Sequence, residues 1–279
     1  MAVENEEIAA RGTYRGLRGA TVAVGERLAA ARAGTVSYPP DVLAALLAEP
    51  APGPGGPAVE VTAEGSMQAA RRLVREAPGA VGVLNFASAR NPGGGYLRGA
   101  RAQEEDLCRS ALLYHCLLAA PDYYAAHRAS TDLRYSHRVI LSPEVPVIRD
   151  DRGELADQPC EVSFLTSPAP NAGQLQLRST APVDAAAVLA VDVAAVLAER
   201  ATRVLAVAAR HGLRRLVLGA WGCGVFRNDP DQVATAFEAA LAHYGVAFDR
   251  VVFAVWDRTP VSANRAAFER RFGVVRVGG

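Results

Sequence analysis

The chain has 279 residues, 50% of them hydrophobic, which is enough for one large domain with a real core, or for one domain with a sizeable extension. Its formal net charge is +1, with acids and bases interspersed, so neither a duplex-binding face nor an anionic membrane surface is favoured. All 30 basic residues are arginines. The absence of lysine excludes a P-loop lysine, a Schiff-base lysine and a catalytic Ser-Lys pair.

The cysteines at positions 108, 116, 160 and 223 are scattered, without the spacing of zinc ligands or of a redox motif. We therefore expect reduced thiols and a cytoplasmic protein. Residues 1–8 contain three glutamates and no apolar run, so they do not form a secretory signal. The most apolar stretch, residues 185–205, is interrupted by charged side chains and indicates a helix of a soluble protein rather than a membrane span.

The N-terminal part has helical spacing within residues 5–47, in two pieces at 22–31 and 41–47. Residues 50–57 are almost entirely proline and glycine, the composition of a linker. We therefore predict an N-terminal helical extension with a linker over residues 1–57, followed by the main domain over residues 58–279.

Strand and helix patterns alternate through the main domain. Strands are expected at 59–62, 80–86, 139–141, 145–149, 161–166, 216–218 and 251–255. Helices are expected at 66–75, 102–118, 183–211, 231–244 and 262–271. This alternation predicts an α/β domain with a largely buried sheet that is covered on both faces.

A glycine-rich loop follows the second of these strands. It runs from Asn85 through the triple glycine Gly93-Gly94-Gly95 and leads to Gln103-Glu104-Glu105 at the start of a helix. Successive glycines let the backbone approach a ligand closely and present N–H groups to it. Taken alone, a triple glycine is more simply interpreted as a flexible turn.

A second glycine-rich loop, residues 218–230, also leaves a strand and enters a helix, with Asn228 or Asp229 suited to the N-cap and Pro230 to the first turn. Its glycines at 219, 222 and 224 precede a helix N-terminus, which favours an anion site suited to a diphosphate. The loop lacks the P-loop lysine, and Arg227 replaces the third glycine of the dinucleotide fingerprint. A purely structural turn is an equally good interpretation of this loop alone.

Together the two loops suggest one phosphate-bearing ligand held between them, because ligands of open α/β sheets bind where such loops meet. Glu104 and Glu105 are adjacent on a helix, so their side chains point roughly 100° apart and cannot both face one bond. One must act while the other positions the substrate. A general acid needs a raised pKa, which the neighbouring carboxylate and a bound diphosphate would supply. The simpler alternative is that both acids only interact with the helix dipole.

The triple glycine, the seven residues 96–102 and then Gln103-Glu104-Glu105 resemble the hallmark of the microbial-type poly(ADP-ribose) glycohydrolases. The resemblance extends over residues 59–255. It includes Asn85-Phe86-Ala87-Ser88, Arg109-Ser110 with Leu113-Tyr114, Pro168-Ala169-Pro170-Asn171, and residues 219–228.

The resemblance implies a macrodomain fold, a three-layer α/β/α sandwich with a mixed sheet that holds ADP-ribose at its strand ends. It makes Glu105 the catalytic residue, with Glu104 and Gln103 orienting the distal ribose beside the triple glycine. Asn91 and Ser88 would contact ribose. The diphosphate would be wrapped by the second loop, with Phe226 against the terminal ribose; the residues concerned are Gly222, Cys223, Gly224, Val225 and Phe226.

The implied reaction is hydrolysis of the ribose–ribose O-glycosidic bonds of poly(ADP-ribose), with Glu105 first donating a proton and then activating water. We expect no cofactor and no metal, since the five histidines are better explained as surface or core residues. The expected partners are poly(ADP-ribose), ADP-ribose and ADP-ribosylated proteins, without sequence-specific nucleic-acid binding or a membrane, and with the chain a monomer.

Two alternatives remain open at this point. One is a macrodomain that binds ADP-ribose without cleaving it, against which Glu105 argues, because a carboxylate near a dianionic ligand costs binding energy. The other is a hydrolase that removes single ADP-ribose units from protein or nucleic acid, which would use the same pocket.

Overall fold

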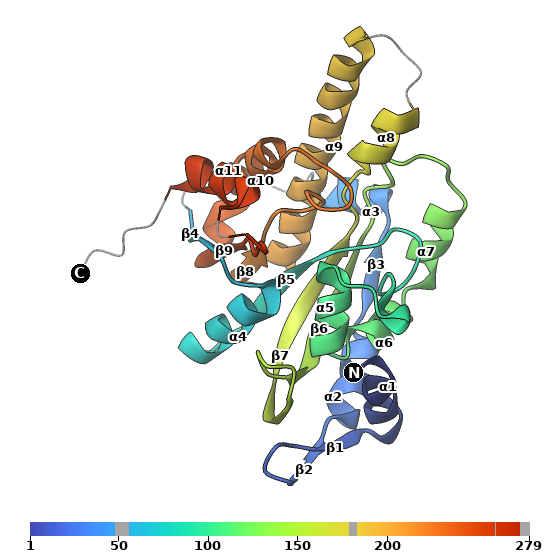
Figure 1. Cartoon of the computed structure of the whole chain (residues 1–279), viewed down its shortest axis with the longest axis vertical. Helices are drawn as coiled ribbons and strands as arrows, with labels where there is room; N and C mark the ends of the chain where they lie inside the picture. The colour runs from blue at the N-terminus through green and yellow to red at the C-terminus, as the bar shows by residue number, and fades with distance from the viewer. Residues whose placement is uncertain (48–55, 179–182, 260, 274–279) are drawn as a thin grey trace, which may run out of the picture.

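The structure, a computed structural model, describes residues 1–47, 56–178, 183–259 and 261–273. A mixed seven-stranded sheet lies between two layers of helices (Figure 1). This arrangement confirms the predicted α/β/α sandwich. No helix of the described residues is long and apolar enough to cross a membrane.

The strand order in the sheet is β3-β6-β7-β5-β8-β9-β4. The five strands from β7 to β4 are parallel, whereas β3, β6 and β7 pair antiparallel. The strands are β3 (Val36–Tyr38), β4 (Ala58–Thr62), β5 (Val81–Phe86), β6 (Val139–Arg149), β7 (Leu155–Ser167), β8 (Arg215–Leu218) and β9 (Arg250–Ala254). The two short strands predicted at 139–149 are the single strand β6, with an irregular register between Ser142 and Val145.

Two apolar cores form because alternate side chains of each strand point to opposite faces. Val217 and Val252 belong to the core under one helical layer, whereas Leu216 and Phe253 belong to the other core. The first layer contains α1 (Ala2–Arg11), α2 (Gly25–Ala33), α4 (Ser66–Glu76), α5 (Gln103–Ser110), α6 (Leu113–Leu117) and α7 (Pro121–Arg128). The second contains α3 (Pro40–Leu47), α8 (Ala172–Arg178), α9 (Val183–Arg210), α10 (Pro230–Tyr244), η2 (Gly245–Ala247) and α11 (Ala263–Phe272).

The sequence predicted a helical N-terminal region, but the structure shows that this region also contains strands. A hairpin of β1 (Thr13–Arg15) and β2 (Thr21–Ala23) separates α1 from α2, and β3 forms an edge of the main sheet by pairing with β6. These strands are each three residues long, too short to establish a period-2 pattern. Most of the linker expected at 50–57 lies outside the described residues.

The helix predicted at 102–118 is interrupted at Ala111. This residue is extended, with φ −128° and ψ 164°, and it forms an isolated bridge with Val147 of β6. Leu112 N then donates to Pro146 O at 3.0 Å. The backbone therefore exchanges one helical turn for pairing with the sheet, which gives the separate helices α5 and α6.

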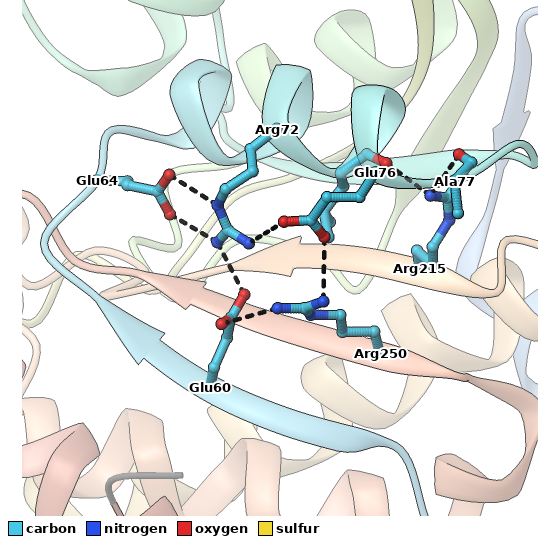
Figure 2. A network of polar contacts seen from close by, with 8 residues as sticks. Glu60, Glu64, Arg72, Glu76, Ala77, Arg215 and Arg250 are labelled. Atoms are coloured by element: carbon cyan, nitrogen blue, oxygen red, sulfur yellow. Dashed lines mark hydrogen bonds and ion pairs between the residues drawn. The ribbon is translucent and has the colours of Figure 1, made fainter. Parts of the chain in front are cut away.

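Helix α4 is fastened to the sheet by a network of ion pairs (Figure 2). Arg72 pairs with Glu60, Glu64 and Glu76 at 2.7–3.0 Å. Arg250 of β9 reaches two of the same carboxylates at 3.0 Å. At the C-terminal end of α4, Arg215 donates to the carbonyls of Leu73 and Ala77, which satisfies acceptors that the helix leaves unpaired. The other end of α4 is thereby fixed beside the candidate site.

Candidate active site

Both glycine-rich loops leave the carboxyl ends of neighbouring parallel strands, since β5 pairs with β8. A Cβ built on Gly219, where the second loop begins, would lie 3.1 Å from the ring of Phe86, the last residue of β5. The structure thus brings the two loops to one edge of the sheet, as their positions in the sequence suggested.

Gln103 attaches the first turn of α5 to strand β5. Its Oε1 accepts from Phe86 N at 2.9 Å, and its Nε2 donates to Leu84 O at 2.8 Å. Nε2 also donates to Ser66 Oγ at 3.1 Å, at the start of α4. The amide is thus engaged at both ends, so these contacts favour a role in positioning the helix. Its predicted contact with ribose stays a prediction.

Glu104 is buried beneath the first loop, with 3% of its surface exposed. Its Oε2 accepts from Ser88 N at 2.7 Å, and its Oε1 accepts from Asn85 Nδ2 at 3.3 Å. Burial raises the pKa of this carboxyl to about 8, against the opposing effect of those hydrogen bonds. At neutral pH much of Glu104 is therefore uncharged and can donate a hydrogen bond.

Glu105 accepts hydrogen bonds from backbone N–H groups of the segment that leads into α5. Its Oε1 accepts from Gly95 N at 2.7 Å, and its Oε2 accepts from Ala102 N at 3.0 Å. The residue is 7% exposed. The two adjacent glutamates therefore point in different directions and contact different partners, as their helical spacing predicted.

Gly94 lies against both glutamates. Its φ is +59°, and an added Cβ would overlap Glu105 Oε1 and lie 3.0 Å from Glu104 Oε2. Gly93 also has a positive φ, +63°, and a Cβ there would lie 3.0 Å from the ring of Tyr114. The first two glycines of the motif are thus required by left-handed backbone and by close approach.

Ser88 and Asn91 form the turn that precedes the glycines. Asn91 N donates to Ser88 Oγ at 3.1 Å, and Asn91 O accepts from Gly94 N at 3.0 Å. Asn91 is exposed and Ser88 is half-buried. Both side chains therefore lie on the loop that contacts the glutamates, while their predicted ribose contacts stay predictions.

The glycines of the second loop have different surroundings. Gly222 has φ +73°, and a Cβ on it would overlap Asn228 Nδ2 and lie 2.5 Å from the Ala169 side chain. Gly224 is exposed, lacks a positive φ, and would place a Cβ within 4 Å of no described atom. The turn therefore requires Gly222, whereas Gly224 leaves its backbone open to a ligand.

The rest of this loop also faces outward in part. Val225 is 82% exposed. Phe226 is half-buried, and its ring centroid lies 6.1 Å from that of Tyr135. Burial raises the pKa of Cys223 to about 12, so this thiol is not a thiolate nucleophile at neutral pH. Asp229 caps α10 by accepting from the N–H groups of the first turn.

The sequence interpretation did not identify Asn85 as a site residue. Its Nδ2 bridges Glu104 Oε1 and Thr166 Oγ1, the latter at 3.1 Å, and the residue is fully buried. A signal was present, because Asn85 is the polar residue of the apolar strand Val81–Phe86. Ser66 was also missed, since its role depends on a contact with Gln103, which is 37 residues away in the sequence.

A mixed sheet between two helical layers, with two glycine-rich loops and a buried glutamate pair at adjacent strand ends, is a macrodomain-type fold with an acidic candidate site. Residues 2–150 match the family described as microbial-type PARG, catalytic domain, where PARG is poly(ADP-ribose) glycohydrolase. The chain belongs to the microbial-type poly(ADP-ribose) glycohydrolase family.

Solved structures agree with this assignment. The poly(ADP-ribose) glycohydrolase of Thermomonospora curvata bound to the inhibitor ADP-HPD is 47% identical, with 97% of each chain covered and a TM-score of 0.86. Another structure of that enzyme is 46% identical over the same shares, with a TM-score of 0.88. The Deinococcus radiodurans enzyme in complex with ADP-ribose is 44% identical, covering 88% of this chain and 96% of its own, with a TM-score of 0.76. The comparison with curated proteins gives no match.

Proposed function

We propose that this chain hydrolyses the ribose–ribose O-glycosidic bonds of poly(ADP-ribose) and releases ADP-ribose, with Glu105 as the general acid and base. The observation that carries the proposal is the position of the Glu105 carboxylate. It is held between Gly95 N and Ala102 N, beside buried Glu104, where the loops from two parallel strands meet. The related enzymes are named poly(ADP-ribose) glycohydrolases, and one of them holds ADP-ribose.

The chemistry starts with Glu105 protonated. As the bond between C1 of the terminal ribose and the bridging oxygen breaks, Glu105 gives its proton to that oxygen, which leaves as a ribose hydroxyl of the shortened polymer. The Glu105 carboxylate then takes a proton from water while the water oxygen bonds to C1. Each carboxylate oxygen has two lone pairs, so a proton on Glu105 does not require loss of either backbone hydrogen bond.

Glu104 orients the ribose in this scheme. Because burial raises the pKa of Glu104 to about 8, the neutral acid is able to donate to a ribose hydroxyl at neutral pH. Its neutrality also removes a negative charge near the substrate phosphates, whereas the sequence had led us to expect a charged carboxylate beside the acid. The diphosphate would lie against the second loop, where Gly224 leaves its backbone open.

The free cysteines support our proposal that this enzyme is cytoplasmic. ADP-ribosylated proteins are its proposed polymer carriers, and the proposed reaction requires no metal or cofactor.

The test is the variant Glu105→Gln, assayed with purified poly(ADP-ribose) and with the product identified as free ADP-ribose. The amide cannot give up a proton, so we expect turnover to be lost while ADP-ribose binding by calorimetry stays near the wild-type value. The amide accepts only through its oxygen, so one of the N–H groups of Gly95 and Ala102 loses its acceptor. We therefore also expect a stability loss of about 1–3 kcal/mol.

Glu7→Gln is the control, because Glu7 is 59% exposed on α1. It should leave turnover, binding and stability unchanged. Substantial polymer hydrolysis by folded Glu105→Gln would remove Glu105 from the acid role. Absence of hydrolysis by the wild-type chain, with ADP-ribose binding retained, would replace the enzyme proposal with a binding module.

A further inference from the structure

The segment between the triple glycine and α5 projects beside Glu105, and we call residues 96–101 the arch. We infer that the outer face of the arch binds the departing part of the polymer, with Arg98 and Arg101 on the diphosphate of the next ADP-ribose unit. This inference rests on the proposed function and assigns the arch a substrate class, a polyanionic chain rather than a single ADP-ribose.

The arch is fixed in place by its own contacts. It begins as the 3-10 helix η1 (Tyr96–Arg98), and Gly95 O accepts from the N–H groups of Arg98 and Ala100 at 2.9 and 3.1 Å. Arg109 of α5 donates to Ala100 O at 2.7 Å. Tyr96 is 2% exposed and packs against Tyr114, with ring centroids 5.4 Å apart. The arch therefore presents its outer face in a defined geometry.

That outer face carries two cations without protein partners. Arg98 and Arg101 are exposed, and within the described part of the chain neither guanidinium forms a hydrogen bond or ion pair. Arg72 and Arg200, in contrast, are bound within the fold: Arg72 pairs with three glutamates, and buried Arg200 donates to backbone carbonyls. Leu97, between Tyr96 and Arg98, is 55% exposed, an apolar surface next to the two charges.

The position of Glu105 places the departing chain at the arch. An acid that protonates the leaving oxygen must contact that oxygen. The two oxygens of Glu105 are bound to Gly95 N and Ala102 N, the residues on either side of the arch. The departing ribose therefore starts at the base of the arch, and the next diphosphate along the chain has to pass its outer face.

The chemistry of the two residues fits that ligand. A guanidinium presents planar paired donors that match phosphate oxygens. The unit being released needs no such side chains, because the second loop offers open backbone at Gly224. Backbone groups therefore recognise the released ADP-ribose, whereas exposed arginines recognise the remaining polymer.

The test is the double variant Arg98→Ala/Arg101→Ala in the full chain, compared with Arg75→Ala/Arg152→Ala. The control arginines are exposed, at the C-terminal end of α4 and in the β6–β7 turn, at the opposite end of the sheet. Both variants change the net charge equally. Three measurements are made: kcat and KM on poly(ADP-ribose) over a range of salt, ADP-ribose affinity by calorimetry, and kinetics on ADP-ribose that carries an uncharged phenol at C1 of its terminal ribose.

We expect the arch variant to raise KM for the polymer about tenfold, with kcat changed less than twofold. The slope of log kcat/KM against the logarithm of salt concentration should become shallower by about one to two. ADP-ribose affinity and KM for the phenol substrate, whose leaving group has no phosphate, should match the wild-type values.

A polymer KM and salt dependence equal to those of the control would overturn the inference while leaving the proposed function intact. An equal rise in KM for both substrates, or a loss of ADP-ribose affinity, would also overturn it, because the arginines would then act on the released unit. The proposed function fails separately, if the wild-type chain does not hydrolyse the polymer.

Discussion

The variant Glu104→Gln is expected to lose less stability than the wild-type protein as pH rises. The folded state holds the proton of Glu104 up to a pKa of about 8, whereas the ordinary value is 4.5. Between these values the folded state binds more protons than the unfolded state, so the free energy of unfolding falls as pH increases. Glutamine has no proton to lose, and its fold should not share this loss.

The size of the effect follows from the same two values. The slope reaches at most about 1.4 kcal/mol per pH unit. Between pH 5 and pH 8 the free energy of unfolding of Glu104→Gln should therefore gain roughly 2–4 kcal/mol relative to wild type. The amide fits the site if Asn85 turns over, because Asn85 Oδ1 has no hydrogen-bond partner among the described residues and would then accept from the new Nε2.

Urea denaturation at pH 5, 6, 7 and 8 measures this difference, with Glu7→Gln as the control. Polymer hydrolysis by Glu104→Gln should be severely impaired at each pH, because ribose positioning is lost. Curves of unfolding free energy against pH that run parallel for wild type and Glu104→Gln would show that Glu104 does not retain its proton in the folded protein. A normal rate of hydrolysis would show that Glu104 is only part of the first turn of α5.

Three further predictions follow from particular contacts. Gly222→Val should lower the melting temperature by several degrees, since φ +73° and Asn228 leave no room for a side chain. Gly224→Val should leave the melting temperature unchanged and weaken ADP-ribose binding, as measured by calorimetry. The reverse pattern would contradict the assignment of the two glycines. Asn5→Ala should lose about 2–4 kcal/mol in urea denaturation, because buried Asn5 donates to two carbonyls at the end of α5 and accepts from Arg149, and a loss below 0.5 kcal/mol would refute this. Burial lowers the pKa of His127 to about 4 from an ordinary 6.5, so the free energy of unfolding should fall as pH drops from 6.5 toward 4. In urea denaturation, His127→Gln should show a shallower slope of unfolding free energy against pH in that window. An unchanged slope would show that His127 does not cause this dependence.

The sequence predicted the elements that have a long, regular pattern. The helix expected at 183–211 corresponds to α9 (Val183–Arg210), and the strand expected at 80–86 to β5 (Val81–Phe86). Elements that depend on distant partners were missed. Strand β3 forms by pairing with the edge of β6, and the helix is interrupted at Ala111 because this residue forms a β-bridge with Val147. Neither partner is visible in a local window of sequence.

The candidate site divides in the same way. The glycines and the acids could be found from spacing, and the divergence of Glu104 from Glu105 follows from helix geometry. The burial of Glu104 could not be predicted, because it depends on Asn85, Ser88 and the surrounding core. Nor could the difference between Gly222 and Gly224 be predicted, since a Cβ built on Gly222 would overlap Asn228 and Ala169, whereas one built on Gly224 would meet no described atom within 4 Å.

The spacing of the glycine and Gln-Glu-Glu motif has a physical explanation in these contacts. Three consecutive residues in the first turn of α5 point about 100° apart, and each direction has its own use. Gln103 binds the backbone of β5, and Glu104 binds the turn at Ser88. Glu105 accepts hydrogen bonds from the N–H groups of Gly95 and Ala102. Glu105 can bridge those two N–H groups only if the residues between them form a closed arch, which the double hydrogen bond to Gly95 O provides. The segment between the third glycine and Gln103 therefore has to return the chain to one carboxylate, which limits the lengths and conformations that it can adopt.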